Sequence, residues 1–217
     1  MPLLGSAAML LNFDILAESV AEHDDWHTHE HFPERLSIPG FVRGTRWTAV
    51  RGAPRYFVLY EVAGLGVLTS PAYLARLNQP TPWTRKMMAS YRGMRRGFCA
   101  VTGSFGAGLG QAARLLHFKP GAQAAPLRDW LLGEHLPALP SKPGFTGAHL
   151  LEAAATPPMT DEQKIRGADA SVDWAIVLAG YDEDALAGAD LRELERHGAT
   201  GLSEGLYRLH YSLAREG

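Results

Sequence analysis

Residues 25–41 read DWHTHEHFPERLSIPGF, and residues 129–145 read DWLLGEHLPALPSKPGF. The two stretches align without a gap and share the dipeptides DW and EH, a proline, and the turn PGF. Because repeated turn and packing residues specify the same local structure twice, we predict a tandem duplication. Two copies are too few for a solenoid. We therefore expect an intramolecular pair of small α+β units that pack against each other.

Each copy reads as the order βαββαβ. In the first copy, alternation and turn residues predict strands at 9–17, 41–50, 55–62 and 95–102 and helices at 22–31 and 70–78. The second copy repeats the order, with strands at 113–118, 145–152, 173–179 and 206–213 and helices at 125–136 and 182–197. The predicted domains are residues 1–102 and 111–217. Between them, residues 103–110 (GSFGAGLG) lack the spacing of a nucleotide-binding loop and are expected to be a flexible linker.

Two insertions distinguish the copies. Residues 79–91 precede the last strand of the first copy, and the polar residues 156–170 replace a tight turn in the second, where we expect a loop. Either insertion could cap the mouth of a cavity.

The composition excludes some classes of protein. The chain has 217 residues, is 46% hydrophobic and 20% charged, and carries a formal net charge of -2, which does not favour a nucleic-acid partner. No apolar run approaches a membrane span, and the first residues lack the basic region of a leader, so we expect a cytoplasmic protein. The single cysteine, Cys99, is expected to be buried in a strand.

Strand alternation predicts which side chains face the space between the two sheets. If Leu11 and Phe13 pack against helices, Asn12 and Asp14 point the other way. The same reasoning turns further polar side chains inward, namely His117, His149, Arg208, His210 and Ser212. We therefore expect an acid and several imidazoles to converge between the sheets; the alternative is that these are water-exposed rim positions.

The first predicted helix is rich in histidine. His27 and His31 lie one turn apart and could share a metal ion, but the second copy has no counterpart of His27, and we expect no metal. The pairs Glu30–His31 and Glu134–His135 occur in both copies. They are interpreted either as helix-end structure or as an acid–base pair at the edge of a cavity.

Several motifs suggest a family. Residues 26–41 (WHTHEHFPERLSIPGF) resemble the helix motif of EthD-like proteins in the dimeric α+β barrel superfamily. Residues 54–61 (PRYFVLYE), 68–73 (LTSPAY) and 80–84 (PTPWT) are similar to the continuation found in its two-repeat branch. The resemblance covers residues 10–102 well and the second copy more loosely. It implies an α+β fold of tandem ferredoxin-like βαββαβ repeats that form an intramolecular dimeric α+β barrel.

The resemblance also implies a ligand cavity between sheet and helices, with His31 near its mouth and His135 as a weaker counterpart. Arginines at positions 35 and 43 are replaced by Leu139 and Gly147 in the second copy. We therefore expect the first copy to supply an anion-binding edge from Arg35, Arg43 and Arg46; surface charge is the alternative.

We expect a small-molecule enzyme without redox cofactor that performs isomerase, cyclase or lyase chemistry by proton transfer on an aromatic or polyketide-like carbonyl compound. The candidate catalytic residues are His31, His117, His210, Asp14 and Glu30. The candidate substrate-binding residues are Arg46, Tyr56, Tyr60, Trp83, His135, His149 and Arg208.

Three other functions stay open: a cofactor-free monooxygenase, a haem-binding barrel enzyme, and a non-catalytic ligand-binding or assembly protein. The non-catalytic alternative predicts a lumen filled by large apolar side chains, whereas the enzyme predicts a cavity with convergent polar groups. The expected partners are a small-molecule substrate and, through exposed strand edges, a second copy in a possible homodimer.

Overall fold

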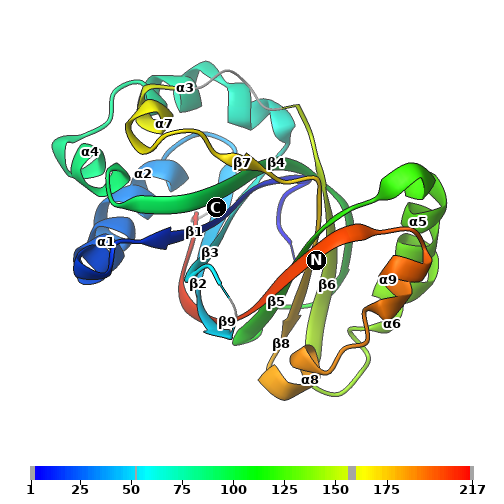
Figure 1. The fold of residues 1–217 in the computed structure, drawn as a ribbon. Helices are drawn as coiled ribbons and strands as arrows, with labels where there is room; N and C mark the ends of the chain where they lie inside the picture. Colours follow the sequence, from blue (N-terminus) through cyan, green and yellow to red (C-terminus); the bar gives the residue numbers. More distant parts are fainter. Residues whose placement is uncertain (1–2, 52, 156–159, 216–217) are drawn as a thin grey trace.

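A computed structural model describes residues 3–51, 53–155 and 160–215 of the chain. Eight antiparallel strands form a closed barrel (Figure 1), in the order β1 (Ala7–Ile15), β3 (Tyr56–Val62), β2 (Phe41–Arg51), β9 (Thr200–Ala214), β5 (Ala112–Lys119), β8 (Trp174–Gly180), β6 (Phe145–Ala153) and β4 (Tyr91–Gly106). Pairing of β1 with β4 closes the barrel, and the short β7 (Ala170–Ser171) lies parallel to β4. The predicted intramolecular α+β barrel of two ferredoxin-like repeats is confirmed.

Helices cover the outside of the barrel in two groups (Figure 1). The first copy contributes α1 (Val20–Trp26), α2 (Phe32–Leu36), α3 (Pro71–Leu77) and α4 (Pro82–Met88). The second contributes α5 (Ala124–Trp130), α6 (Leu136–Ala138), α7 (Asp161–Arg166), α8 (Glu183–Ala187) and α9 (Arg192–Arg196). Helix α7 lies with the first group, beside α3 and α4 (Figure 1).

The first helix of each copy contains one wider turn. A π-helical turn, His27–His31, joins α1 to α2, and an equivalent π turn, Leu131–His135, joins α5 to α6. Such turns are rare and occur often at functional sites. The repeated Glu–His dipeptide forms the last two residues of both π turns. The two copies therefore share this irregular turn as well as the regular helices and strands.

The repeated Pro–Gly turn has a steric reason. Gly40 and Gly144 have φ angles of 92° and 90°, a region that side chains other than glycine rarely adopt. A Cβ atom at Gly40 would lie 2.5 Å from a methyl carbon of Val67, and one at Gly144 would lie 2.3 Å from Cβ of Ala185. Each turn therefore requires glycine to lead the chain from helix into strand.

Apolar side chains fill both the helix-covered faces and the barrel lumen. On β3 every residue is buried, with Tyr56 and Tyr60 on the helix side and Phe57 in the lumen. The Trp47 ring stacks on Phe57 inside the lumen, with centroids 4.6 Å apart. The middle of the lumen therefore has the apolar filling that the non-catalytic alternative predicts, and in the described ranges the predicted acid and imidazoles do not meet there.

Several element boundaries differ from prediction, and three of the differences change the assignment of a whole segment. Strand β4 continues to Gly106 and pairs with β6, so residues 103–106 of the predicted linker are strand. The helix predicted at 182–197 is divided into α8 and α9. Within the predicted loop 156–170, residues 161–166 form α7, because Thr160 and Gln163 make a reciprocal cap at its start; residues 156–159 lie outside the described ranges.

Burial of the Cys99 thiol confirms its predicted placement and raises its pKa to about 12. Across the described ranges, none of the helices has the length and apolar character needed to cross a bilayer.

Candidate active site on the helix side of the first copy

Three histidines follow one face of the first helix and point toward the barrel. His23, His27 and His31 are spaced by four residues, and their exposed fractions are only 0%, 1% and 5%. The ring centroids of His23 and His27 are 5.0 Å apart, and those of His27 and His31 are 5.4 Å apart. The helix thus places a row of imidazoles between itself and the outer face of the sheet.

Tyrosines from the sheet meet this row. The Tyr60 hydroxyl lies 3.0 Å from Nε2 of His27, and the Tyr91 hydroxyl lies 3.3 Å from Nε2 of His23. Burial raises the pKa of both tyrosines, so they remain neutral hydroxyls. Either hydroxyl can exchange a hydrogen bond with its imidazole partner, or with a ligand.

Burial also keeps the imidazoles neutral. It lowers the pKa of His27 and His31 well below the usual histidine value, and nearby cations, including Arg35 beside His31, add to the lowering. Nδ1 of His27 and Nδ1 of His31 have no hydrogen-bond partner in the described part of the chain. Unpaired buried nitrogens are uncommon, and they mark positions that a ligand or water could complete.

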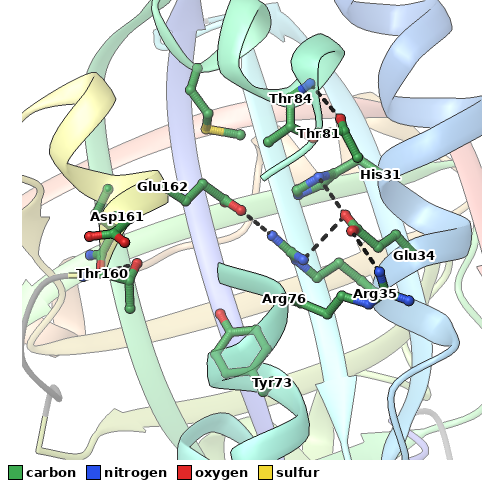
Figure 2. Close-up of polar contacts among 12 residues, drawn as sticks. His31, Glu34, Arg35, Tyr73, Arg76, Thr81, Thr84, Thr160, Asp161 and Glu162 are labelled. Atoms are coloured by element: carbon green, nitrogen blue, oxygen red, sulfur yellow. Dashed lines mark hydrogen bonds and ion pairs between the residues drawn. The ribbon is translucent and has the colours of Figure 1, made fainter. Parts of the chain in front are cut away.

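An arginine closes the far end of the row. Arg35 is 1% exposed, and its Nη2 lies 2.6 Å from Oε2 of Glu162 on α7. Figure 2 shows this ion pair. On the other side Glu34 approaches both Arg35, at 3.5 Å, and Nδ1 of His31, at 3.9 Å. Because Glu162 belongs to the second copy, the two copies together complete this end of the site.

Helix α7 is fixed by further ion pairs. Arg166 lies 2.8 Å from Asp169, and Asp169 lies 3.3 Å from Arg96 on β4. Burial alone would raise the pKa of Asp169, but Arg166, Gln163 and Arg96 lower it below its usual value. The insertion of the second copy therefore caps the first copy through buried charges.

Together these elements enclose a chamber of about 20 Å³, which is room for a water molecule. We call it the first-copy chamber. Its apolar wall comes from methionines and leucines of the strands and helices. The lining residues are Met9, Leu11, His27, His31, Arg35, Tyr73, Leu77, Met88, Tyr91, Met94, Arg96, Glu162 and Arg166.

An open groove of about 640 Å³ lies at the other end of the histidine row. Here Arg46 donates from Nε to Nδ1 of His210 (3.2 Å) and from Nη2 to the hydroxyl of Thr28 (3.0 Å). Asp24 accepts a hydrogen bond from the Tyr56 hydroxyl at 2.7 Å. The groove is thus polar and accessible, in contrast to the chamber.

Asp24 and His23 connect groove and chamber. The Asp24 carboxylate lies 3.3 Å from Nδ1 of His23, whose other nitrogen faces Tyr91. Partial burial would raise the pKa of Asp24, but hydrogen bonds from His23 and Tyr56, with Arg46 nearby, lower it. A proton could therefore pass between the chamber wall at Tyr91 and the groove.

The structure brings five of the candidate catalytic and substrate-binding residues to this region, namely His31, Arg46, Tyr56, Tyr60 and His210. His210, however, faces the helices and not the lumen. Arg46 pairs with Tyr211 and Trp47 with Leu209, so His210 is the extra residue of a β-bulge, and the alternation on which its inward placement was predicted breaks there. The same error affected Arg208, which lies outside and pairs with Glu183 at 2.7 Å.

Other predicted residues lie elsewhere. His117 and His149 do face the lumen, but with different neighbours: His149 bonds to Ser104 (3.1 Å), whereas His117 lies at a mouth of the barrel. Asp14 accepts a hydrogen bond from the Arg55 backbone at 2.7 Å. None of these side chains lines the first-copy chamber.

Two predicted residues hold helices together. Glu30 accepts hydrogen bonds from Trp26, Thr81 and Thr84, and these bonds tie the π turn to α4. Trp83 donates to Glu22 at 3.2 Å and joins α4 to α1.

His135, the counterpart of His31 in the second copy, has different surroundings. Its ring stacks on Trp130 with centroids 4.6 Å apart and borders an open groove of about 610 Å³. Sequence analysis missed His23, Tyr91, Glu162 and Arg166. The spacing of His23 from His27 could have indicated the first; the others come from the end of a strand and from a short helix without apolar periodicity.

The barrel has clear structural relatives. It matches an anthrone oxidase-like protein with a TM-score of 0.67 and 9% sequence identity, and the match covers 96% of this chain and 92% of the other. It also matches a proposed monooxygenase of Fusobacterium nucleatum with a TM-score of 0.64 and 7% identity, covering 99% of this chain and 97% of the other. A third match is the chlorite dismutase of Candidatus Nitrospira defluvii, with a TM-score of 0.57 and 12% identity over 94% of this chain and 91% of the other. No family model and no curated protein matches the sequence. These likenesses show that the chain has the dimeric α+β barrel fold.

Proposed function

We propose that this protein is a small-molecule enzyme whose substrate binds in the first-copy chamber. In the first chemical step, a neutral imidazole removes a proton from the substrate. One observation carries the proposal: His27 and His31 are buried with lowered pKa values, the Nδ1 of each has no hydrogen-bond partner in the described part of the chain, and the buried cation Arg35 lines the same chamber. A base, an oxyanion partner and an apolar wall are the elements of proton abstraction from a carbonyl compound.

The lowered pKa of the imidazoles limits the substrate. A weak base removes protons only from compounds whose conjugate base is well delocalised, such as phenols, 1,3-diketones and polyketide-like aromatics. His31 is the proposed base, because the Glu34 carboxylate at 3.9 Å from Nδ1 stabilises the imidazolium that forms. Arg35 and the hydroxyl of Tyr91, which both line the chamber, would stabilise the substrate oxyanion.

Substrate entry requires the chamber to enlarge. Its volume of about 20 Å³ does not accommodate an aromatic ring, and a porphyrin does not fit it in this form. Met88 and Met94 line the chamber and can change rotamer at low cost. Displacement of α7 would release Arg35 from Glu162 toward a substrate oxygen.

The connection through His23 offers a path for the proton to leave. From the chamber it would pass by Tyr91 and His23 to Asp24, which borders the groove. In this proposal His23 and Asp24 act on the proton and do not touch the substrate.

After proton abstraction two outcomes are chemically open. Isomerisation, cyclisation or elimination needs only the protein's acid–base groups. Cofactor-free oxygenation is the second candidate, and the likeness to an anthrone oxidase-like protein and a proposed monooxygenase favours it. Membership of the EthD-like family is part of this proposal, since those structures define only the barrel.

The test measures solvent deuterium exchange into the acidic C–H positions of anthrones and 1,3-diketones, together with dioxygen uptake. We expect the wild-type protein to accelerate exchange and His31→Gln to reduce it roughly 100-fold or more. His135→Gln, the same change at the duplicated position, is the control and should leave the rate unchanged. Uptake of dioxygen would assign oxygenation. Equal rates in wild type and His31→Gln would exclude His31 as the base, and absence of exchange with all compounds would favour the non-catalytic alternative.

A further inference from the structure

A second cavity opens at one mouth of the barrel lumen, separate from the first-copy chamber. Its volume is about 180 Å³, several times that of a water molecule. Leu115 and Pro54 give it apolar surface, and Asn12, Arg95 and His117 give it polar groups. It is therefore large enough for a small organic molecule and has the mixed lining typical of ligand sites.

His117 is the least satisfied side chain of this mouth. It is 6% exposed, and neither ring nitrogen has a hydrogen-bond partner among the residues that the structure describes. Burial, with Arg95 nearby, lowers the pKa of His117 to about 3, so the ring is neutral and offers one donor and one acceptor. A buried ring with both nitrogens unpaired calls for a ligand or ordered water.

Arg95 supplies the positive charge. In the described ranges its side chain donates to the Ser203 hydroxyl at 3.2 Å and forms no ion pair with a carboxylate. Of the acids nearby, Glu204 also lines the cavity but is bound by Arg114 at 2.6 Å, and Asp14 is held by the Arg55 backbone. Among the described residues that line this cavity, Arg95 is therefore the cation available to an anionic ligand.

Asn12 makes the floor of the mouth rigid. Its amide nitrogen donates to the Tyr56 carbonyl at 2.8 Å and to the Tyr207 hydroxyl at 3.0 Å. Below it, the packed rings of Trp47 and Phe57 close the lumen. A ligand would thus be held at the mouth and would not pass through the barrel.

We propose that this lumen mouth binds the carboxylate of a small organic acid, with the carboxylate between Arg95 and His117 and the carbon body against Leu115 and Pro54. The site does not depend on the proposed chemistry of the first-copy chamber. A carboxylate suits the pair because a guanidinium and an imidazole N–H both donate, and charge-assisted hydrogen bonds are the stronger kind.

The test follows the His117 ring by NMR in the full-length protein, titrated with acetate and, as its neutral isostere, acetamide. We expect a saturable shift of the His117 resonances with acetate and none with acetamide. Arg95→Gln should weaken acetate binding about 10-fold, the loss of a charge-assisted hydrogen bond. Arg92→Gln, an exposed arginine on the same strand, is the matched control and should bind like wild type.

The proposal would be overturned by any of the following results. They are an unmoved His117 in wild-type protein at saturating acetate, an equal response to acetamide, and equal weakening by both arginine changes. A response to inorganic phosphate without one to acetate would contradict the carboxylate assignment. Circular dichroism of each variant verifies that the fold is intact.

Discussion

At the scale of single residues, the Tyr60 hydroxyl is the hydrogen-bond partner of one ring nitrogen of His27, Nε2. Tyr60→Phe leaves both nitrogens of a buried imidazole unpaired, and we expect it to lower the free energy of unfolding by about 1–3 kcal/mol. Urea unfolding measures the change. Tyr211→Phe is the control, because the Tyr211 hydroxyl makes no hydrogen bond in the described ranges. Equal stability of wild type and Tyr60→Phe would contradict the importance of this pair.

Single residues also show what alternation can and cannot predict. It placed Leu11 and Phe13 against the helices and turned Asn12, His117 and His149 toward the lumen, as the structure has them. It failed at His210, because a β-bulge adds one residue and reverses the faces on either side of it. A bulge depends on pairing with another strand, which the local sequence does not encode.

At the scale of elements, α7 is held to the first copy by the pair Arg35–Glu162. Glu162→Gln leaves a buried guanidinium without its closest counter-charge, and we expect a loss of about 3–5 kcal/mol in unfolding free energy. Asp161→Asn, the adjacent and exposed carboxylate of α7, should cost less than about 1 kcal/mol. Thermal and urea unfolding of both variants decide the point; similar losses would mean that α7 is not anchored by Glu162.

The repeated turn makes a second prediction at this scale. Gly40→Ala places a Cβ at positive φ and against Val67, and we expect it to destabilise the protein by at least about 1–2 kcal/mol. Gly66→Ala, where an added Cβ meets nothing within 4 Å, should be close to neutral. Denaturant titration compares the two, and a neutral Gly40→Ala would contradict the steric reason for the repeat.

Some elements around the site could be predicted from the sequence and others could not. The histidine-rich helix and its duplicate were recognised because their residues recur. The π turns, α4 and α7 were not predicted. They are short and lack an apolar period, and α7 gains its position from buried ion pairs with a distant part of the chain. The spacing of Thr160 and Gln163 could have indicated the helix start, but the sequence does not indicate which residues pair with Glu162 and Arg166.

At the scale of the whole molecule, buried neutral histidines make stability depend on pH. A histidine whose pKa is lowered by folding binds more protons in the unfolded state, so stability falls as the pH drops below the unfolded value of about 6.5. For His149, whose pKa burial lowers to about 3, the loss should approach about 1.4 kcal/mol per pH unit between those two values.

Unfolding free energies of wild type and His149→Gln at pH 7, 6 and 5 test this dependence. The variant should lose less stability on acidification than wild type. His29→Gln is the control, because His29 is 71% exposed. Parallel pH profiles for wild type and His149→Gln would contradict the predicted contribution.

Closure of the barrel bears on assembly. The eight strands pair in a ring, so within the described ranges the strand edges through which a homodimer was expected are used inside one chain, with only the short β7 added. A homodimer stays a prediction, and it would need a surface other than these edges. The two copies are already partners of each other, most directly where α7 of the second caps the first-copy chamber.

The central claim is that the first copy, on its helix side, holds the functional site. The most direct measurement is an NMR map of the nine histidine rings with and without an anthrone or 1,3-diketone that the protein binds. We predict that the resonances of His23, His27 and His31 change on binding while those of His135 and His149 do not. Changes confined to His135, or to the lumen histidines, would contradict the claim and place the site elsewhere in the barrel.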